Sequence, residues 1–161
     1  MIVPTAADML KSVQTTLECV IKPDLGSTTT RSAAASVCHM LRIATLRIET
    51  EGQILHDERL RLNALLPQVA DWLSSEGLTI PASIAARPRL AEDVYPSLAI
   101  MADEVGLLRQ GVCDSLEILQ GTTLDATGHQ LLTDMLAHVA WQLEQEGKMI
   151  APATVGHGPR R

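Results

Sequence analysis

Residues 96–121 read PSLAIMADEVGLLRQGVCDSLEILQG, and this stretch decides the fold class. Its apolar side chains recur at intervals of three and four residues, which places them on one stripe of an α-helix: Met101, Val105, Leu108, Val112, Leu116 and Leu119. We predict a helix that begins after Pro96 and ends at Gly121. Because such a stripe must be covered, other elements have to pack around this helix.

The composition indicates that those other elements are helices too. The chain has 161 residues, of which 46% are hydrophobic and 20% charged, with no Phe, one Tyr and two Trp. A core built from Leu, Ile, Val, Met and Ala favours packed helices over a sheet rich in aromatic and β-branched residues. The length suits one domain. We expect a single helical domain over residues 1–150 and a mobile tail over residues 151–161.

Capping and stop signals place the remaining helices. Thr5 followed by Asp8 has the spacing of a helix start, and this first helix should run to about Ile21 and stop before Pro23. The polar stretch 24–30 should be a loop whose threonines cap the next helix. A second helix is predicted at about 31–51 and should close at Gly52. A third is predicted at about 55–75, with a kink or restart at Pro67 and a stop at 76–77. The last is predicted at about 129–146 and should close at Gly147. Residues 79–89 should be a surface connector.

A shift of 95 residues lays one part of the chain on another. Met40-Leu41 then falls on Met135-Leu136, and Glu51-Gly52 falls on Glu146-Gly147. We therefore predict two similar helical hairpins, 5–52 and 98–147. Their similarity arises either from a true duplication or by chance, because helices that need the same cap and the same apolar stripe have similar sequences. The predicted fold is an all-α, antiparallel four- to five-helix bundle, with the 55–76 helix laid against the two hairpins.

Charge and cysteine content exclude several classes of protein. The formal charge is 13 − 19 = −6, which argues against binding to nucleic acid or to an anionic membrane surface. Three widely spaced cysteines make a disulfide framework improbable. No apolar run approaches the roughly 18 residues of a membrane span, and the first residues do not form a signal peptide. We expect a reduced, soluble, cytoplasmic protein.

No motif in the sequence indicates catalysis. A carboxylate-bridged di-metal site in a helical bundle needs Glu-x-x-His pairs, and a structural zinc site needs Cys-x-x-Cys; neither occurs. Phosphate-binding glycine loops and the nucleophile-elbow spacing are also missing. Asp134 and His138 should form a solvated contact one helical turn apart. The charges of residues 57–61 should likewise form a solvated face, with Leu60, Leu62, Leu65 and Leu66 on its buried side. We therefore expect no catalytic residues, no metal and no cofactor.

The segment 32–52, SAAASVCHMLRIATLRIETEG, is apolar on two faces. Its main stripe, Val37, Leu41, Ala44 and Ile48, should face the core. Ile43 and Leu46 lie on the opposite side, beside polar residues, and are either buried beneath the 55–76 helix or form part of a surface that binds another protein. Trp141 is either an interface anchor or covered by the C-terminal tail. The candidate interaction residues are His39, Arg42, Ile43, Leu46, Glu49 and Trp141.

The first 75 residues resemble a known family. VPTAADML (3–10), CHMLRIATLRIETEGQ (38–53) and HDERLRLNALL (56–66) are similar to a small bacterial helical domain of unknown function, which occurs beside or fused to kinases of the aminoglycoside-phosphotransferase type. After about Ser75 the sequence departs from the family's pattern. The resemblance implies an accessory subunit that supports a kinase acting on a small hydroxylated acid or its CoA thioester, with the catalytic residues in the partner.

Three functions follow as hypotheses. The first is a non-catalytic interaction subunit of a cytoplasmic metabolic enzyme, which could also form a homodimer through the same surface. The second is a ligand-binding or catalytic bundle in which His39 and Arg42 line a pocket and Arg42 holds a carboxylate or phosphate. The third is a self-associating structural protein.

Overall fold

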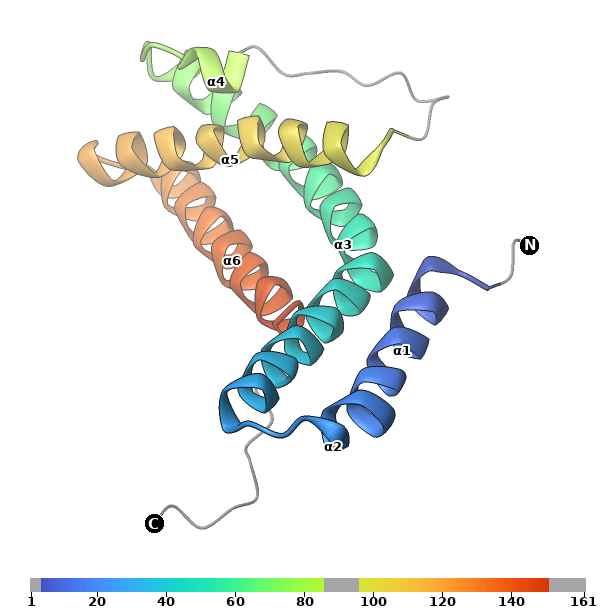
Figure 1. Cartoon of the computed structure of the whole chain (residues 1–161). Helices are drawn as coiled ribbons and strands as arrows, with labels where there is room; N and C mark the ends of the chain where they lie inside the picture. Colours follow the sequence, from blue (N-terminus) through green and yellow to red (C-terminus); the bar gives the residue numbers. More distant parts are fainter. Residues whose placement is uncertain (1–3, 86–95, 151–161) are drawn as a thin grey trace. The chain divides into compact units, whose positions relative to one another are not determined.

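The computed structural model describes residues 4–85 and 96–150, and every regular element in these ranges is a helix (Figure 1). The predicted all-α class is confirmed. The elements are α1 (Ala6–Thr16), a π-helical turn η1 (Leu17–Ile21), α2 (Lys22–Asp24), α3 (Thr28–Ser75), α4 (Ala82–Ala85), α5 (Leu98–Gly121) and α6 (Ala126–Lys148). The predicted tail, 151–161, lies outside the described residues.

The chain divides into two compact units. Unit 1 consists of residues 1–51 and 146–161, and unit 2 consists of residues 52–145, so that the boundary falls inside α3. The single domain over residues 1–150 and the packing of hairpin 5–52 against hairpin 98–147 stay predictions.

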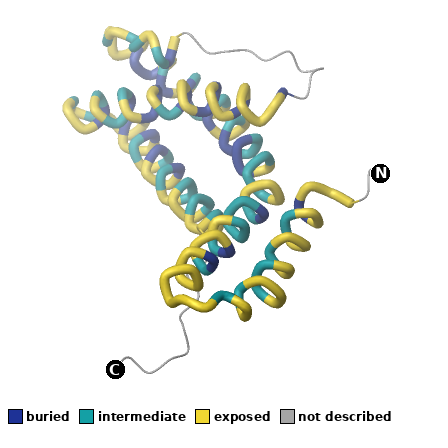
Figure 2. The backbone as a smooth tube through the Cα atoms, in the orientation of Figure 1, coloured by how far each residue is buried: buried dark blue, intermediate teal, exposed yellow. Residues whose placement is uncertain are grey.

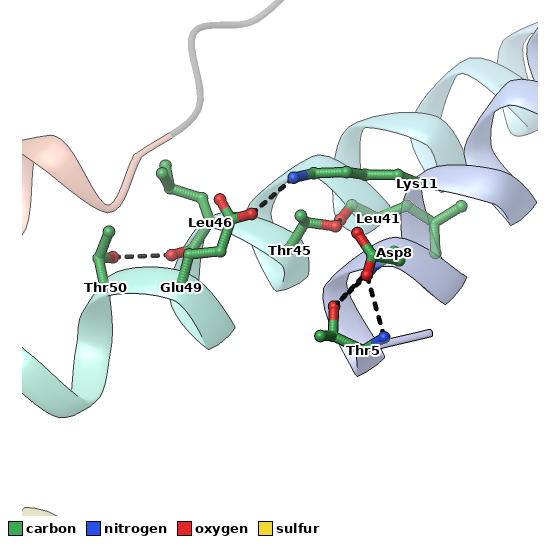
Figure 3. Close-up of polar contacts among 8 residues, drawn as sticks. All are labelled: Thr5, Asp8, Lys11, Leu41, Thr45, Leu46, Glu49 and Thr50. Carbon is green, nitrogen blue, oxygen red and sulfur yellow. Dashed lines mark hydrogen bonds and ion pairs between the residues drawn. The ribbon is translucent and has the colours of Figure 1, made fainter. Parts of the chain in front are cut away.

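In unit 1, α1 begins as the sequence predicts. Thr5 Oγ accepts a hydrogen bond from the backbone N–H of Asp8 at 3.2 Å, and the Asp8 carboxylate accepts one from the backbone N–H of Thr5 at 3.0 Å (Figure 3). The Thr5 hydroxyl also donates to the Asp8 carboxylate at 2.7 Å, and this bond together with the one from the Thr5 backbone N–H holds the pKa of Asp8 below its usual value. Lys11 of α1 donates to Glu49 of α3 at 2.6 Å, which ties the two helices together (Figure 3).

The end of this first helical segment differs from the prediction. The helix does not stop before Pro23 but continues through the π-helical turn to Asp24. Pro23 lies at the start of the short helix α2, where its missing N–H costs little. The next helix begins at Thr28 rather than at Arg31, and its cap is Ser27, whose Oγ accepts from the N–H of Thr30 at 3.1 Å.

The prediction that a helix closes at Gly52 is wrong, because α3 runs without a break from Thr28 to Ser75. An internal glycine costs a helix about 1 kcal/mol. Burial of Ile54 and Leu55 immediately afterwards offsets that cost. The helix also continues through Pro67, where a restart was one of two predicted outcomes.

The predicted stop at residues 76–77 is confirmed. Gly77 has φ +67°, and the N–H of Leu78 donates to the carbonyl of Leu73 at 2.9 Å, which closes α3 in the manner of a Schellman turn. The following segment is not purely a surface connector, since it contains α4 and Ile84 is fully buried. Residues 86–89 of that segment lie outside the described ranges.

Three helical segments share the core of unit 2: the second half of α3, α5 and α6. Their buried apolar residues form one cluster with Ile84 of α4: Leu62, Leu66, Val69, Trp72, Leu73, Leu108, Val112, Leu119, Leu131 and Met135. A smaller cluster contains Leu55, Met101 and Val105. The 55–76 region is therefore a full member of this core, and the stripe predicted for residues 101–119 is largely buried in it. Figure 2 shows the alternation of buried and exposed residues along these helices.

The bounds predicted for the last two long helices agree closely with the structure. Ser97 Oγ caps α5 by accepting from the N–H of Ile100, and α5 ends at Gly121, as predicted. The helix α6 begins three residues earlier than expected and ends one residue past Gly147, at Lys148. Asp125 precedes α6 and accepts from Trp72 Nε1 at 3.0 Å and from the N–H of Gly128 at 2.7 Å.

Candidate functional site

The inner face of the first half of α3 consists of small side chains. Ala34, Cys38 and Thr45 are 7%, 1% and 6% exposed, respectively. Burial raises the pKa of the Cys38 thiol, and the nearby Glu18 carboxylate adds to the shift. Thr45 donates its hydroxyl to the carbonyl of Leu41 at 2.9 Å (Figure 3), so its polar group is satisfied inside the helix. Small side chains let another helix approach closely, and the Lys11–Glu49 ion pair shows that α1 lies along this side.

The stripe that the sequence places in the core lies partly on the surface. Val37 and Ile48 are 42% and 52% exposed, and Met40, which shares their side of the helix, is 59% exposed. The prediction that Val37 and Ile48 face the core is therefore wrong. Its physical reason is that Ala34, Cys38 and Thr45 fill the inner face, which turns the larger apolar residues outward. We call Val37, Met40 and Ile48 the outer stripe of α3.

Four of the predicted interaction residues lie on α3 between the inner face and the outer stripe. His39, Arg42, Ile43 and Leu46 are all half-buried. Arg42 Nε donates weakly to the carbonyl of Cys38 at 3.4 Å. His39 Nδ1 is buried without a hydrogen-bond partner among the described residues. Ile43 and Leu46 are therefore neither fully buried in a core nor fully exposed to solvent.

Two hollows in unit 1 lie near these residues but are lined by others. A hollow of about 280 Å³ between α3 and the end of α6 is lined by Ile43, Arg47, Glu146, Met149 and Ile150. Another, of about 390 Å³, is lined by Glu18, Lys22, Pro23 and Arg31. Neither is lined by His39 or Arg42, the pair that the alternative hypothesis of a ligand-binding bundle places in a pocket.

The remaining two predicted residues are engaged elsewhere. Glu49 is exposed but ion-paired with Lys11, so it does not join Arg42 in one patch. Trp141, in unit 2, is half-buried, and the guanidinium carbon of Arg61 lies 4.5 Å from its ring centroid. Since Arg61 covers part of the indole ring, Trp141 is not a bare surface anchor.

Sequence reasoning missed a buried charged cluster in unit 2. Glu58, assigned to a solvated face, is completely buried, whereas Leu60, expected on the buried side, is 53% exposed. The signal was available, because Glu58 lies four residues after Ile54 and four before Leu62, on the stripe that packs inward. A carboxylate on such a stripe must be paired with a cation.

Arg109 supplies that cation. Its Nε and Nη2 each donate to a different oxygen of Glu58 at 2.7 Å, a two-bond pairing that joins α5 to α3. Beside it, Arg59 Nη1 lies 3.5 Å from Glu104 Oε2, a second pair between the same helices. These ion pairs fix the register of α3 against α5 in unit 2.

His138 of α6 borders this cluster. The predicted solvated contact between Asp134 and His138 is wrong, because His138 is 4% exposed and Asp134 accepts instead from Gln130 at 2.9 Å. Nε2 of His138 lies 3.9 Å from Glu58 Oε1, too far for a hydrogen bond. Burial lowers the pKa of His138; the Glu58 charge opposes that shift and the Arg61 and Arg109 charges add to it. The ring is therefore neutral near pH 7.

No group of three or more His, Cys, Asp or Glu side chains that could hold a metal ion occurs among the described residues. Within residues 4–85 and 96–150, no helix combines the length and apolarity needed to cross a membrane. No protein-family model, curated protein or solved structure matches the chain.

Proposed function

We propose that the protein is a non-catalytic interaction subunit that binds another protein through the outer stripe of α3 in unit 1. The observation that carries this proposal is the exposure of Val37, Met40 and Ile48 on one side of a helix whose other side is packed. Exposed apolar side chains are common singly, but a stripe of them on one helix face is typical of a binding surface.

The outer stripe supplies part of the free energy that a specific complex needs. Full burial of one such side chain stabilises by about 1.5–3 kcal/mol, so covering the half that is still exposed yields about 1 kcal/mol each. Three residues together contribute roughly 3 kcal/mol, which corresponds to about a hundredfold in Kd. The half-buried Ile43 and Leu46 lie on the side of α3 opposite Val37 and Ile48 and do not contribute to this contact.

The partner class to test first is a metabolic kinase. The resemblance of residues 3–66 to a domain found beside aminoglycoside-phosphotransferase-type kinases supports this choice. In this proposal the kinase carries the catalytic residues and acts on a hydroxy acid or its CoA thioester. The protein itself supplies the docking surface.

Met40→Asp tests the docking surface, with Leu107→Asp as its matched control. Both side chains are 59% exposed, but Leu107 lies on α5 in unit 2. Each variant should therefore fold, and thermal unfolding checks that it does. We expect Met40→Asp to weaken binding to the purified kinase at least a hundredfold, because a carboxylate would be buried against an apolar surface. Leu107→Asp should bind like the wild type.

Two results would reject the proposal. One is that the two aspartate variants bind the kinase with equal affinity. The other is a stable dimer of this chain in sedimentation velocity that Met40→Asp dissociates, together with no binding of the kinase. The outer stripe would then be the interface of a self-associating protein.

A further inference from the structure

The outer side of α1 in unit 1 is apolar and exposed. Val13 is 54% exposed, and Val20, in the π-helical turn that continues α1, is 60% exposed. The other side of this helical segment carries Ala7, Leu10 and Leu17, which are buried or half-buried. Like the first half of α3, α1 is therefore apolar on two sides and covered on one.

The helix α1 and the first half of α3 run antiparallel. Lys11 pairs with Glu49 at 2.6 Å. Further along the segment, Glu18 lies close enough to Cys38 to raise the pKa of its thiol. Residue numbers therefore rise along one helix as they fall along the other.

The exposed valines of the two helices point to the same side of this antiparallel pair. Val13 comes one residue before Gln14, which lies two turns after the buried Ala7 and so faces α3. Val37 likewise comes one residue before Cys38, which is buried. One residue turns a side chain by about 100° around a right-handed helix. When two helices face each other and run antiparallel, turns of the same sense lead to the same side of the pair.

This side extends the outer stripe of α3 across to α1. By the register of the two contacts above, Val13 lies within about one residue of the level of Ile48, and Val20 within about one residue of the level of Val37. We call these four residues the hairpin face. Met9 lies one turn before Val13, past the end of this face, and so belongs to its solvent-exposed rim.

The charged residues of both helices lie away from the hairpin face. Those of α1 and the π-helical turn are turned by about 130–160° from Val13: Asp8, Lys11 and Glu18. On α3, Arg42 is turned by about 140° from Val37. The core of a protein interface is depleted of charge, whereas binding to a nucleic acid or an anionic lipid needs cations on the contact surface. The hairpin face therefore suits an apolar, uncharged protein surface.

The outer stripe of α3 by itself is a narrow contact. One helix is about 10 Å wide, whereas a standard interface covers about 800 Å² on each partner. Including α1 doubles the width of the contact. Burial of Val13 and Val20 adds the apolar area of two more side chains, which should tighten binding by about tenfold or more.

We infer that the partner covers α1 as well as α3, with an uncharged apolar surface at least two helices wide, an extension that rests on the proposed function. Val13 and Val20 are then binding residues, and α1 forms half of the docking surface besides supporting α3.

Val13→Asp tests this extension, with Thr15→Asp as its matched control on the same helix. Both residues are exposed, and Thr15 is turned by about 160° from Val13. Each variant adds one carboxylate to α1, so circular dichroism and thermal unfolding should show the same small change in both. In calorimetric titrations with the purified kinase, Val13→Asp should bind at least tenfold more weakly than the wild type, and Thr15→Asp within about twofold of it. Val13→Gln, which adds no charge, should bind several-fold more weakly and decides the question if Val13→Asp unfolds.

Met40→Asp separates this extension from the proposed function. If Met40→Asp weakens binding while Val13→Asp and Val13→Gln bind like Thr15→Asp, the partner covers α3 alone, and the extension is overturned while the proposed function stands. If neither Met40→Asp nor Val13→Asp weakens binding, both are overturned.

The wild type without the kinase tests the other possible occupants of the hairpin face. A dimer in sedimentation velocity that Val13→Asp dissociates would assign the face to a second copy of this chain. Binding to phosphatidylcholine vesicles that Val13→Asp abolishes would assign it to a lipid surface. Either result would overturn the extension.

Discussion

The Glu58–Arg109 pair offers the sharpest prediction about stability. Glu58 is fully buried, and Arg109 makes two hydrogen bonds of 2.7 Å to it. Arg109→Met keeps much of the aliphatic stem but leaves a buried carboxylate without its cation. Removing one member of a buried pair costs about 3–5 kcal/mol. We expect a loss near 3 kcal/mol, because the Arg109 side chain is 35% exposed and water can partly replace it.

Urea unfolding of the full chain measures this loss. The double variant Glu58→Met, Arg109→Met is the control, since it removes both charges and should recover most of the stability that Arg109→Met loses. An Arg109→Met variant within about 1 kcal/mol of the wild type would refute the reasoning, because Glu58 would then have to be solvated or held by other groups. A double variant as unstable as Arg109→Met alone would show that packing, and not the unpaired charge, sets the cost.

Two further predictions concern unit 2. In the folded state the pKa of His138 is lowered from 6.5. As the pH falls below 6.5, the unfolded chain therefore binds more protons at this residue than the folded chain does. The wild type should therefore lose stability between pH 7.5 and 5.5, and His138→Gln should lose less; equal slopes in urea titrations at the two pH values would count against this. Gly128→Ala should lower the thermal midpoint by several degrees, because its Cβ would lie 2.9 Å from both Trp72 and Leu124. An unchanged midpoint in a scanning calorimetry experiment would show that the contact relaxes freely.

Most of the helical structure could be predicted from the sequence, because it depends on local signals. The Thr5 cap, the start of α5 after Pro96 and its end at Gly121 each follow from the residues at that point. Gly52 carries the same signal as a helix end, but packing of the following residues outweighs it. Local propensity differs by about 1 kcal/mol at such a position, and burial of one large side chain exceeds that.

The candidate sites were harder to predict, because they depend on which face of a helix its neighbours cover. On α3 the larger apolar residues define one stripe and the smaller residues define another, and the structure buries the smaller ones: Ala34, Cys38 and Thr45. Hydrophobicity alone predicts the opposite, with the larger apolar residues buried and the smaller ones exposed. The burial of His138 likewise depends on its neighbours on α3 and α5, which residue spacing along α6 cannot reveal.

Methionine oxidation footprinting tests the central claim most directly, because four methionines report on different surfaces of one chain. Met40 lies in the outer stripe, Met9 is 53% exposed on α1, and Met101 and Met135 are buried controls. The protein is oxidised with dilute peroxide, first purified and then in its complex with the kinase, and the Met40 rate is divided by the Met9 rate. We expect this ratio to fall several-fold in the complex while Met101 and Met135 stay slow in both. A ratio that does not change when the kinase is bound would contradict the claim that α3 docks a partner through Val37, Met40 and Ile48.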